Sequence, residues 1–351
     1  MLDGQITSLP NFETEGLHSI SGLSSGAFMT VQMHIAHSAD FIGAGVIAGG
    51  PYRAAQSFRA APTVPMSCIL NSLYVAMTPL TQATAPNVDK LVGMARETPR
   101  IDALDHLKKQ KLYIFSGKSD AVVNPYAVRT TYEFYRALGV PETQIEFVTD
   151  IDAGHSIITD NPEDSPLSTN RPPYINFGGF FQSHHVLEHI YGKRKPPAKK
   201  ALGEMIRFYQ ADFIGFAQDR ACMAEFGYAY IPSKVKKSGK AIGVHIALHG
   251  CKQGYAFVDF VNGLEATQAQ PPYGDRYITT TGYIEWAEAN DLIVLFPQAD
   301  GGDSNAVQNP DGCWDWWGYS AADLAEPDYY TQDAVQIKAI HSMLEELTNA
   351  V

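Results

Sequence analysis

A serine flanked by two glycines, in the stretch Gly22-Leu23-Ser24-Ser25-Gly26, is the first feature of the chain that could carry out chemistry. The form G-x-S-x-G often marks a serine nucleophile exposed on a sharp turn between a strand and a helix. A serine hydroxyl is a weak nucleophile at neutral pH, so it needs a neutral histidine within hydrogen-bonding reach and a carboxylate that orients this histidine. The motif also occurs by chance, so its meaning depends on whether these two partners follow.

Two residues occupy the places expected for the partners of Ser24. In folds that use this turn, the acid and then the histidine follow the serine along the chain, each after a strand. Asp120 follows the predicted strand 111–117, and His155 follows the predicted strand 143–150. Gly154 is expected to let the chain turn sharply before the histidine. We therefore predict a catalytic triad.

Each of these residues has an alternative role. Asp150 and Asp152 are rival acids, but they lie too close to His155 in the sequence to stand at the end of a separate strand. Asp120 has an alternative role as the cap of a helix that follows it. An ordinary glycine-rich turn is the alternative for Ser24. The chain order of serine, acid and histidine favours the triad.

The chemistry also needs two backbone N–H groups that stabilise the negatively charged oxygen of a tetrahedral intermediate. One normally comes from the residue after the nucleophile, here Ser25, and the other from a loop that often begins with His-Gly. The loop "LHGCKQG" (248–254) follows a predicted strand, and its candidate donor is Cys251. This loop lies in the C-terminal half of the chain, far beyond the serine.

Strands and helices alternate on both sides of a basic, proline-containing stretch at 193–200. Such alternation predicts a mostly parallel sheet with helical crossovers. Before this stretch, the predicted strands are 17–21, 42–50, 111–117 and 143–150, and the predicted helices are 27–38, 88–97, 124–138 and 181–192. After it, the predicted strands are 225–233, 243–250 and 291–299, and the predicted helices are 279–290 and 329–350, the last with Thr331 as its cap.

The position of Ser24 near the start of the chain raises a question of topology. Strands that normally precede such a nucleophile occur here at the C-terminal end. We therefore predict a circularly permuted α/β-hydrolase fold, with a mostly parallel central sheet flanked by helices. The expected organisation is a single catalytic domain over 1–351, with nucleophile, acid and base in 1–192, a linker at 193–200 and the oxyanion loop in 201–351. No separate substrate-binding domain is expected.

The composition argues against several classes of function. The chain of 351 residues has a formal net charge of −12, which disfavours binding to nucleic acid or to an anionic membrane surface. No apolar run approaches the roughly 20 residues that a membrane-spanning helix needs. The first residues resemble no signal peptide, so we expect either a cytoplasmic protein or a mature form whose signal peptide has been removed. The four cysteines form no C-x-x-C pair of a zinc or redox site.

Several stretches together resemble one known family. They are "SGLSSGAFM", "AGGPY", "GKSD", "GHS", "GYAYIP", "HIALHGC", "LFPQA" and "NPDGCWDWWGY", in matching order over nearly the whole chain. On these stretches the sequence resembles the single-domain, circularly permuted polyhydroxybutyrate depolymerases, which are α/β-hydrolase esterases. The resemblance implies a serine esterase that cleaves poly(3-hydroxybutyrate) or its oligomers through an acyl-enzyme. It implies Ser24 as nucleophile, Asp120 as orienting acid, His155 as base, and Ser25 and Cys251 as oxyanion donors.

The same resemblance implies further features. Trp314 is expected to touch the substrate in an apolar surface crevice, and a disulfide between Cys251 and Cys313 is expected to tie the oxyanion loop to the tryptophan loop. For Trp316 and Trp317 we favour a role in the core or in shielding the disulfide. No metal or organic cofactor is expected. The expected partner is a polyester or oligoester, without nucleic acid or membrane insertion. We expect a monomer, extracellular or periplasmic if a signal peptide has been removed and cytoplasmic otherwise.

Two features depart from the family pattern. Arg53 and the pair Gly178-Gly179 stand where relatives often carry a cysteine, which leaves the pairing of Cys68 and Cys222 open. The segment 256–278, after the oxyanion loop, is longer than usual. We expect this segment to cover or reshape the crevice.

Three other functions stay open on the sequence. The same triad suits a carboxylesterase that acts on acetylated or feruloylated polysaccharide or on short esters, with the tryptophans of 314–317 stacking on sugars. The stretch "HVLEH" (185–189) matches the H-x-x-E-H form of zinc metallopeptidases, and His185 and His189 would share one helix face. His249 could likewise be a metal ligand, as the alternative to a structural role in its loop. A non-catalytic binding protein on a hydrolase scaffold is the third possibility.

Overall fold

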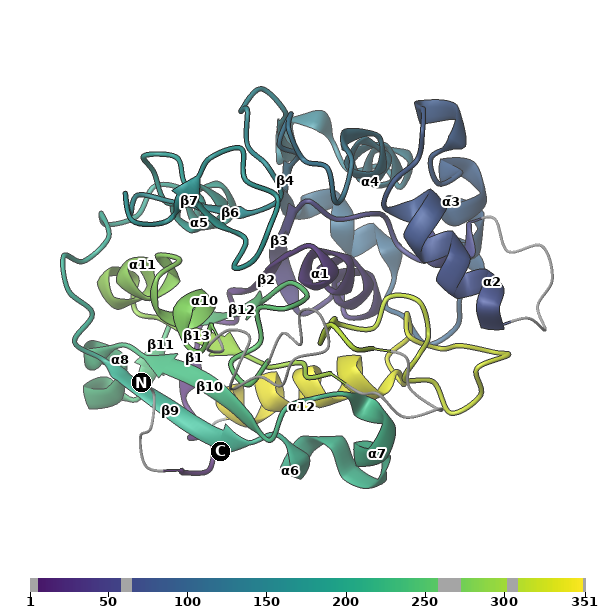
Figure 1. Cartoon of the computed structure of the whole chain (residues 1–351). Coiled ribbons are helices and arrows are strands. Elements are labelled where there is room, and N and C mark those ends of the chain that lie inside the picture. Colours follow the sequence, from purple (N-terminus) through teal and green to yellow (C-terminus); the bar gives the residue numbers. More distant parts are fainter. Residues whose placement is uncertain (1–5, 58–64, 258–272, 302–308, 350–351) are drawn as a thin grey trace, which may run out of the picture.

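Strands from both halves of the sequence assemble into one mixed sheet in the computed structural model (Figure 1), which describes residues 6–57, 65–257, 273–301 and 309–349. Within these residues, the eight strands of this sheet are β2 (His18–Leu23), β3 (Phe41–Ile47), β4 (Lys111–Phe115), β5 (Ile145–Val148), β9 (Glu204–Tyr209), β10 (Phe226–Ile231), β12 (Gly243–Leu248) and β13 (Leu292–Phe296). Their order is β5-β4-β3-β2-β12-β13-β10-β9. β10 pairs antiparallel with β13 and β9, and the other neighbours pair in parallel.

The central strands are continuous apolar runs because both faces of the sheet are covered. Every residue of β12 and β13 is buried. The predicted α/β class with a mostly parallel sheet is therefore confirmed. The edge strand β9 was not predicted. Only Ile206 and Phe208 of its six residues are buried, so it lacks the continuous apolar run that marks the central strands.

Helices cover both faces of the sheet (Figure 1). α1 (Ser25–Ala36), α4 (Pro125–Ala137) and α12 (Val335–Thr348) lie on one face, and α5 (Gln182–Tyr191) and α11 (Tyr283–Asn290) lie on the other. α5 packs directly on β3, where a Cβ at Gly45 would lie 2.5 Å from the Val186 side chain. α1 is buried along its whole length. The helix that follows Ser24 is thus a core element.

Shorter elements fill the connections. They are β1 (Glu13–Thr14), η1 (Ala54–Gln56), α2 (Pro65–Leu70), η2 (Asn71–Ala76), η3 (Gln82–Thr84), α3 (Val88–Glu97), η4 (Leu104–Lys109), η5 (Glu142–Gln144), β6 (Ile157–Thr159), β7 (Ser165–Pro166), β8 (Ile175–Phe177), α6 (Ala211–Ile214), η6 (Gly215–Ala217), α7 (Gln218–Ala221), α8 (Ser233–Ser238), β11 (Lys240–Ala241) and α10 (Arg276–Thr279). β6, β8 and β7 form a small sheet, and β1 pairs with β11.

The last helix begins later than predicted. Thr331 was predicted as its cap, but α12 begins at Val335 and has Ala334 at its N-cap position. Thr331 Oγ1 instead accepts a hydrogen bond from the backbone N–H of Asp333 at 3.2 Å, within the preceding turn. A threonine side chain that satisfies a local turn competes with a capping role, which explains the difference.

The two ends of the described chain lie side by side. The Phe12 N–H donates to the carbonyl of Leu347 at 3.0 Å, and Asn11 Nδ2 donates to the carbonyl of Asn349 at 2.6 Å. Read from residue 201 to the C-terminus and then from the N-terminus, the strands occur as β9, β10, β12, β13, β2, β3, β4 and β5. The sheet order then becomes 1-2-4-3-5-6-7-8. A permuted chain order accounts for this arrangement, and the division at 193–200 stays a prediction.

A buried histidine on α1 makes the stability of the fold depend on pH. His34 is fully buried, and its Nε2 lies 2.6 Å from Oε1 of Gln110, which can only accept. Nε2 therefore carries the proton, and Nδ1 accepts a hydrogen bond from the Tyr135 hydroxyl at 2.8 Å. Burial lowers the pKa of His34 to about 4. The neutral ring is the form that the fold accommodates.

We expect the free energy of unfolding to fall as the pH is lowered from about 6.5 to about 4, because the unfolded state binds a proton at His34 over this interval and the folded state does not. This residue alone would contribute roughly 3 kcal/mol. Urea unfolding at pH 7 and pH 5 tests this, with His34→Gln as the control that removes the titrating group. Wild type should lose more stability than His34→Gln between the two pH values. Equal losses would contradict the assignment.

Candidate active site

Ser24 occupies a strained turn between β2 and α1. Its backbone angles are φ 58° and ψ −123°, in a region that residues other than glycine rarely adopt. Both flanking glycines are required by close packing, because a Cβ at Gly22 would lie 2.3 Å from the Gly26 carbonyl carbon, and one at Gly26 would lie 2.4 Å from the His249 carbonyl oxygen. The Ser24 N–H donates to the carbonyl of Ile47 at 3.0 Å. The turn predicted from G-x-S-x-G is therefore present.

Asp120 and His155 meet beyond the ends of β4 and β5. Nδ1 of His155 lies 2.8 Å from Oδ2 of Asp120, and both side chains are at most 2% exposed. Oδ1 of Asp120 accepts hydrogen bonds from the N–H groups of Val122 and Val123, each at 2.9 Å. The carboxylate is thus held in place on one oxygen and faces the imidazole with the other. Because Nδ1 is engaged, Nε2 is the ring nitrogen available to a hydroxyl.

The rival acids do not contact the histidine, and the helix cap expected as an alternative role for Asp120 is another residue. Asp150 and Asp152 are exposed, and Asp152 accepts a hydrogen bond from the hydroxyl of Ser119. The N-cap of α4 is Asn124, whose Oδ1 accepts a hydrogen bond from the Tyr126 N–H at 2.8 Å. The structure brings Asp120, and not these rivals, to the histidine.

Gly154 serves a different purpose from the one predicted. Its φ is outside the positive region, so the chain does not need a glycine there for the turn itself. A Cβ at this position would lie 2.3 Å from the carbonyl oxygen of Thr169 and 2.6 Å from that of Ser168. The glycine is needed because the segment before β8 passes directly against the loop that carries His155.

Ser24 and His155 line the same cavity, which has a volume of about 700 Å³. Its walls come from both halves of the chain and are largely apolar or aromatic. The apolar and aromatic members are Ile69, Leu73, Met77, Val122, Tyr174, Trp316 and Trp317. Sequence reasoning missed the contributions of α2 and η2, because short helices in an irregular connection show no periodicity that would place them at the site.

Two backbone N–H groups adjoin the serine. Ser25 is the first residue of α1, so its N–H has no acceptor within the helix. Cys251 lies in the loop after β12, between two engaged neighbours: the Gly250 N–H donates to Oε1 of Gln253 at 2.7 Å, and the Lys252 N–H donates to the Asp311 carbonyl at 2.7 Å. In the part of the chain that the structure describes, no acceptor faces the Cys251 N–H.

His249 orients the peptide that carries this N–H. Its Nε2 accepts a hydrogen bond from the Ala299 N–H at 3.0 Å, so Nδ1 carries the proton and donates to the Gly250 carbonyl at 2.7 Å. In a trans peptide the C=O and N–H point in opposite directions, so the Cys251 N–H points away from His249. A Cβ at Gly250 would lie 3.1 Å from Cβ of Ser24, which places this peptide beside the serine.

Burial lowers the pKa of His249 to about 4, so the ring stays neutral at neutral pH. Both ring nitrogens are engaged by backbone groups. His249 therefore has the structural role in its loop, and not the role of a metal ligand that was its alternative.

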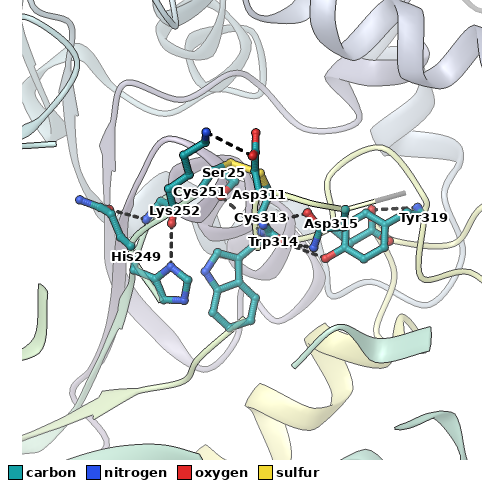
Figure 2. The surroundings of a disulfide bond; sticks show 12 residues. Ser25, His249, Cys251, Lys252, Asp311, Cys313, Trp314, Asp315 and Tyr319 are labelled. Atoms are coloured by element: carbon teal, nitrogen blue, oxygen red, sulfur yellow. Dashed lines mark hydrogen bonds and ion pairs between the residues drawn. A yellow bond between two sulfur atoms is a disulfide. The ribbon is translucent and has the colours of Figure 1, made fainter. Parts of the chain in front are cut away.

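A disulfide joins the loop of Cys251 to the tryptophan loop. Cys251 and Cys313 are bonded at 2.05 Å, and Figure 2 shows the bridge above the indole of Trp314. Nζ of Lys252 lies 3.4 Å from the Asp311 carboxylate, and the backbone N–H of Trp314 donates to the Ser25 hydroxyl at 3.3 Å. The two loops beside the serine are thus held as one unit.

The other two cysteines do not belong to this unit. Cys68 is buried, and burial raises the pKa of the Cys222 thiol to about 12.

The expectation that Trp314 touches a substrate is wrong for this structure. Trp314 is 0% exposed, and its indole packs 5.4 Å from the His249 ring beneath the disulfide (Figure 2). Trp316 and Trp317 line the cavity instead. Trp316 stacks on Phe28 of α1, with ring centroids 3.8 Å apart. The loop is irregular, so no spacing rule distinguishes these three indoles in the sequence.

Two groups of histidines have the residue types of a metal site. In the "HVLEH" stretch, His185 stacks on Phe180, and His189 is held between the Glu146 carboxylate at 3.1 Å and the Gln144 carbonyl at 3.1 Å. This pair therefore does not form the zinc site that its sequence form resembles.

Among the described residues, His37, Asp40 and His341 bring three potential ligand atoms within 4.8 Å of one another. The two imidazole rings stack at 3.7 Å with an interplanar angle of 11°. Their in-plane lone pairs therefore do not converge on one ion.

Of the segment 256–278, residues 258–272 lie outside the described residues, so the expectation that this segment covers or reshapes the crevice stays a prediction.

No protein-family model matches the chain. The chain is 32% identical over 335 residues to a poly(3-hydroxybutyrate) depolymerase of Delftia acidovorans, in an alignment that covers 94% of this chain and 59% of that protein. It is 30% identical over 330 residues to a polyhydroxybutyrate depolymerase of Talaromyces funiculosus, covering 89% of this chain and 86% of that protein. The chain thus spans less than two thirds of the Delftia protein and most of the Talaromyces protein.

Two solved structures have a similar fold. One is a PHB depolymerase from Penicillium funiculosum, with a TM-score of 0.80 and 26% identity. The other is a serine-to-alanine variant of a PHB depolymerase complexed with an R3HB trimer, with a TM-score of 0.79 and 27% identity. Each comparison covers 98% of this chain and 99% of the other. With 30% identity to the Talaromyces protein over 86% of that protein, and a similar fold over 98% of this chain, the chain belongs to the polyhydroxybutyrate depolymerase family.

Proposed function

We propose that this protein is a serine esterase that hydrolyses poly(3-hydroxybutyrate) or its short oligomers through an acyl-enzyme. The observation that carries the proposal is that Ser24 and His155 line one cavity, while Nδ1 of His155 lies 2.8 Å from the Asp120 carboxylate. The substrate class rests on the relatives, which are named as depolymerases of this polyester, and on the structural neighbour complexed with an R3HB trimer.

In the acylation step, Nε2 of His155 takes the proton of the Ser24 hydroxyl as its oxygen attacks the ester carbonyl carbon. The carbonyl electron pair moves onto the oxygen, which accepts hydrogen bonds from the N–H groups of Ser25 and Cys251. Asp120 keeps the imidazole in the required tautomer and stabilises the imidazolium. When the carbonyl re-forms, the ester C–O bond breaks, and the departing alcohol oxygen takes the proton from Nε2.

Deacylation repeats the same steps with water. His155 removes a proton from water as the water oxygen attacks the acyl carbon, and the same two N–H groups hold the oxyanion. Collapse of the intermediate breaks the bond to Ser24, whose oxygen recovers the proton from the histidine. The product is a hydroxy acid or a shorter oligomer. No step requires a metal or an organic cofactor.

The surface around the cavity supports an apolar polyester as substrate. Leu73 lines the cavity and is 48% exposed, and Leu70 and Tyr74, from the same two consecutive short helices, are also exposed. Grouped exposed apolar side chains are uncommon on a monomeric protein unless they contact another apolar surface. A solid polyester presents such a surface, whereas a polysaccharide presents hydroxyl groups.

The disulfide between Cys251 and Cys313 supports an extracellular or periplasmic location, because such bonds persist in oxidising compartments. In the described part of the chain, none of the helices has the length and apolar character needed to cross a bilayer. The monomeric state expected from the sequence stays a prediction.

Release of 3-hydroxybutyrate from the polymer and from its trimer, with p-nitrophenyl butyrate as a soluble ester, tests the proposal. Ser24→Ala should lower kcat by about 10⁴-fold or more on every substrate. The matched control is Ser25→Ala, which keeps the backbone N–H and loses only the hydroxyl that accepts from Trp314. It should stay within about tenfold of wild type.

Two outcomes of this experiment would contradict the proposal. If Ser24→Ala turns over substrate as fast as wild type, Ser24 is not the nucleophile. If wild type cleaves p-nitrophenyl butyrate but neither the polymer nor its trimer, the protein is an esterase whose substrate is not this polyester, and a carboxylesterase for other esters is favoured.

The reassignment of the tryptophans gives a second prediction. Trp317→Ala should raise the KM for the oligoester by roughly tenfold, because it removes an indole from the cavity wall. Trp314→Phe should leave KM near that of wild type and lower the free energy of unfolding by about 1–3 kcal/mol, since this indole is buried. Steady-state kinetics and urea unfolding of both variants test the pair. A larger effect of Trp314→Phe on KM would restore Trp314 as the contact.

A further inference from the structure

One carboxamide joins the two loops that carry the acid and the base. Asn170 lies in the connection between β7 and β8. Its Oδ1 accepts hydrogen bonds from the N–H of His155 at 2.8 Å and from the N–H of Ala121 at 2.9 Å. Its Nδ2 donates to the carbonyl of Ser119 at 2.9 Å and to that of Ser168 at 3.2 Å. The side chain thus contacts both residues that flank Asp120 and the backbone of the histidine itself.

The orientation of this amide follows from its partners. Backbone N–H groups only donate and backbone carbonyls only accept, so the oxygen of Asn170 must face the two N–H groups and the nitrogen must face the two carbonyls. Asparagine supplies two acceptor sites and two donors from one small planar group. Aspartate of the same shape can only accept when ionised, and alanine supplies neither. The contact set is therefore matched to this residue type.

The two loops need such a link because the sheet ends before it reaches the triad. Beyond β4 and β5, the Lys118 N–H donates to the Ile151 carbonyl at 2.9 Å, and the Ser119 N–H donates to the Ala153 carbonyl at 3.0 Å. Among the described residues, no further backbone hydrogen bond joins the two loops beyond these two. Asn170 bonds Ser119 and Ala121 on one loop and His155 on the other, and so links the loops where Asp120 and His155 lie.

We propose that Asn170 is a positioning residue of the triad, which fixes the backbone of His155 relative to Asp120 so that Nε2 is held for proton transfer with Ser24. The inference rests on the proposed function, since it assumes that these three residues perform the reaction. Asn170 is not one of the described residues that line the cavity, so it acts through the loops and not on the substrate. A misplacement of the histidine by a fraction of an ångström would affect turnover more than binding.

The first test is Asn170→Ala, assayed on p-nitrophenyl butyrate. We expect kcat to fall by about 10- to 100-fold with KM within twofold of wild type, and the rate of phosphonylation of Ser24 by a fluorophosphonate to fall by the same factor. The matched control is Asn161→Ala, in the same region of the chain, whose Oδ1 accepts, among the described residues, a single hydrogen bond from the Glu163 N–H at 3.2 Å. This control should match wild type.

The second test is Asn170→Asp, which keeps an acceptor for the N–H groups of His155 and Ala121 and loses the donor to the carbonyls of Ser119 and Ser168. The added negative charge beside the histidine favours the imidazolium. The acid limb of the kcat/KM profile should therefore move to higher pH by about half a unit, whereas the limb of Asn170→Ala should not move. A purely structural role would lower the melting temperature of both variants without lowering kcat at the pH optimum, whereas a positioning role lowers kcat in both. If Asn170→Ala does not fold, Asn170→Asp carries the test.

The proposal is overturned if folded Asn170→Ala, or Asn170→Asp where Asn170→Ala does not fold, keeps kcat within twofold of wild type at its pH optimum, or if the loss appears in KM alone. Failure of the proposed function is distinguishable from these results. In that case Ser24→Ala would retain activity, or wild type would cleave p-nitrophenyl butyrate but not the polyester, whatever Asn170 does.

Discussion

The close approach of the Ser24 turn to the end of β12 is the constraint on which the rest of the site depends. Ser24 has a positive φ of 58°, a conformation that costs a residue other than glycine roughly 1–3 kcal/mol and persists only when its surroundings impose it. Here the surroundings are backbone, since Gly26 lies against the carbonyls of Leu248 and His249. The next residues of that strand end are Gly250 and Cys251, so the contact that strains the serine also brings the second oxyanion donor to it.

The site is therefore a product of the seam between β2 and β12, which come from opposite ends of the chain. β12 pairs in parallel with β2, from His245 opposite Ser19 to Leu248 opposite Gly22. The acid and base reach the serine from the other side, along β4 and β5. The chemistry needs few mobile parts, because hydrogen bonds set the positions of the loops.

How much of this was predictable follows from where each residue gets its position. Ser24, Asp120 and His155 each follow a predicted strand of an alternating strand–helix pattern, so the sequence places them at one edge of a parallel sheet. The permuted fold was predicted because the strands that normally precede the serine appear at the other end of the chain, whereas the pairing of β2 with β12 is known only from the structure. Helix boundaries were less well predicted at α12, where Thr331 satisfies a turn and not the helix.

Contacts between irregular loops could not be predicted. Trp314 lies beneath the disulfide whereas Trp316 and Trp317 line the cavity, because of the way one loop folds, and no periodicity records this. The purpose of Gly154 was mistaken for the same reason, since the segment that crowds it comes from a connection with little regular structure. Asn170 carries four hydrogen bonds but sits in a stretch whose composition predicts only a loop.

The most direct test of the central claim is to react the protein with a fluorophosphonate ester and locate the adduct by peptide mass spectrometry. The account predicts one adduct per chain, on Ser24, because this hydroxyl alone is placed on the strained turn with His155 in its cavity. An adduct on another serine, Ser25 included, or no adduct on a protein that hydrolyses p-nitrophenyl butyrate, would contradict it.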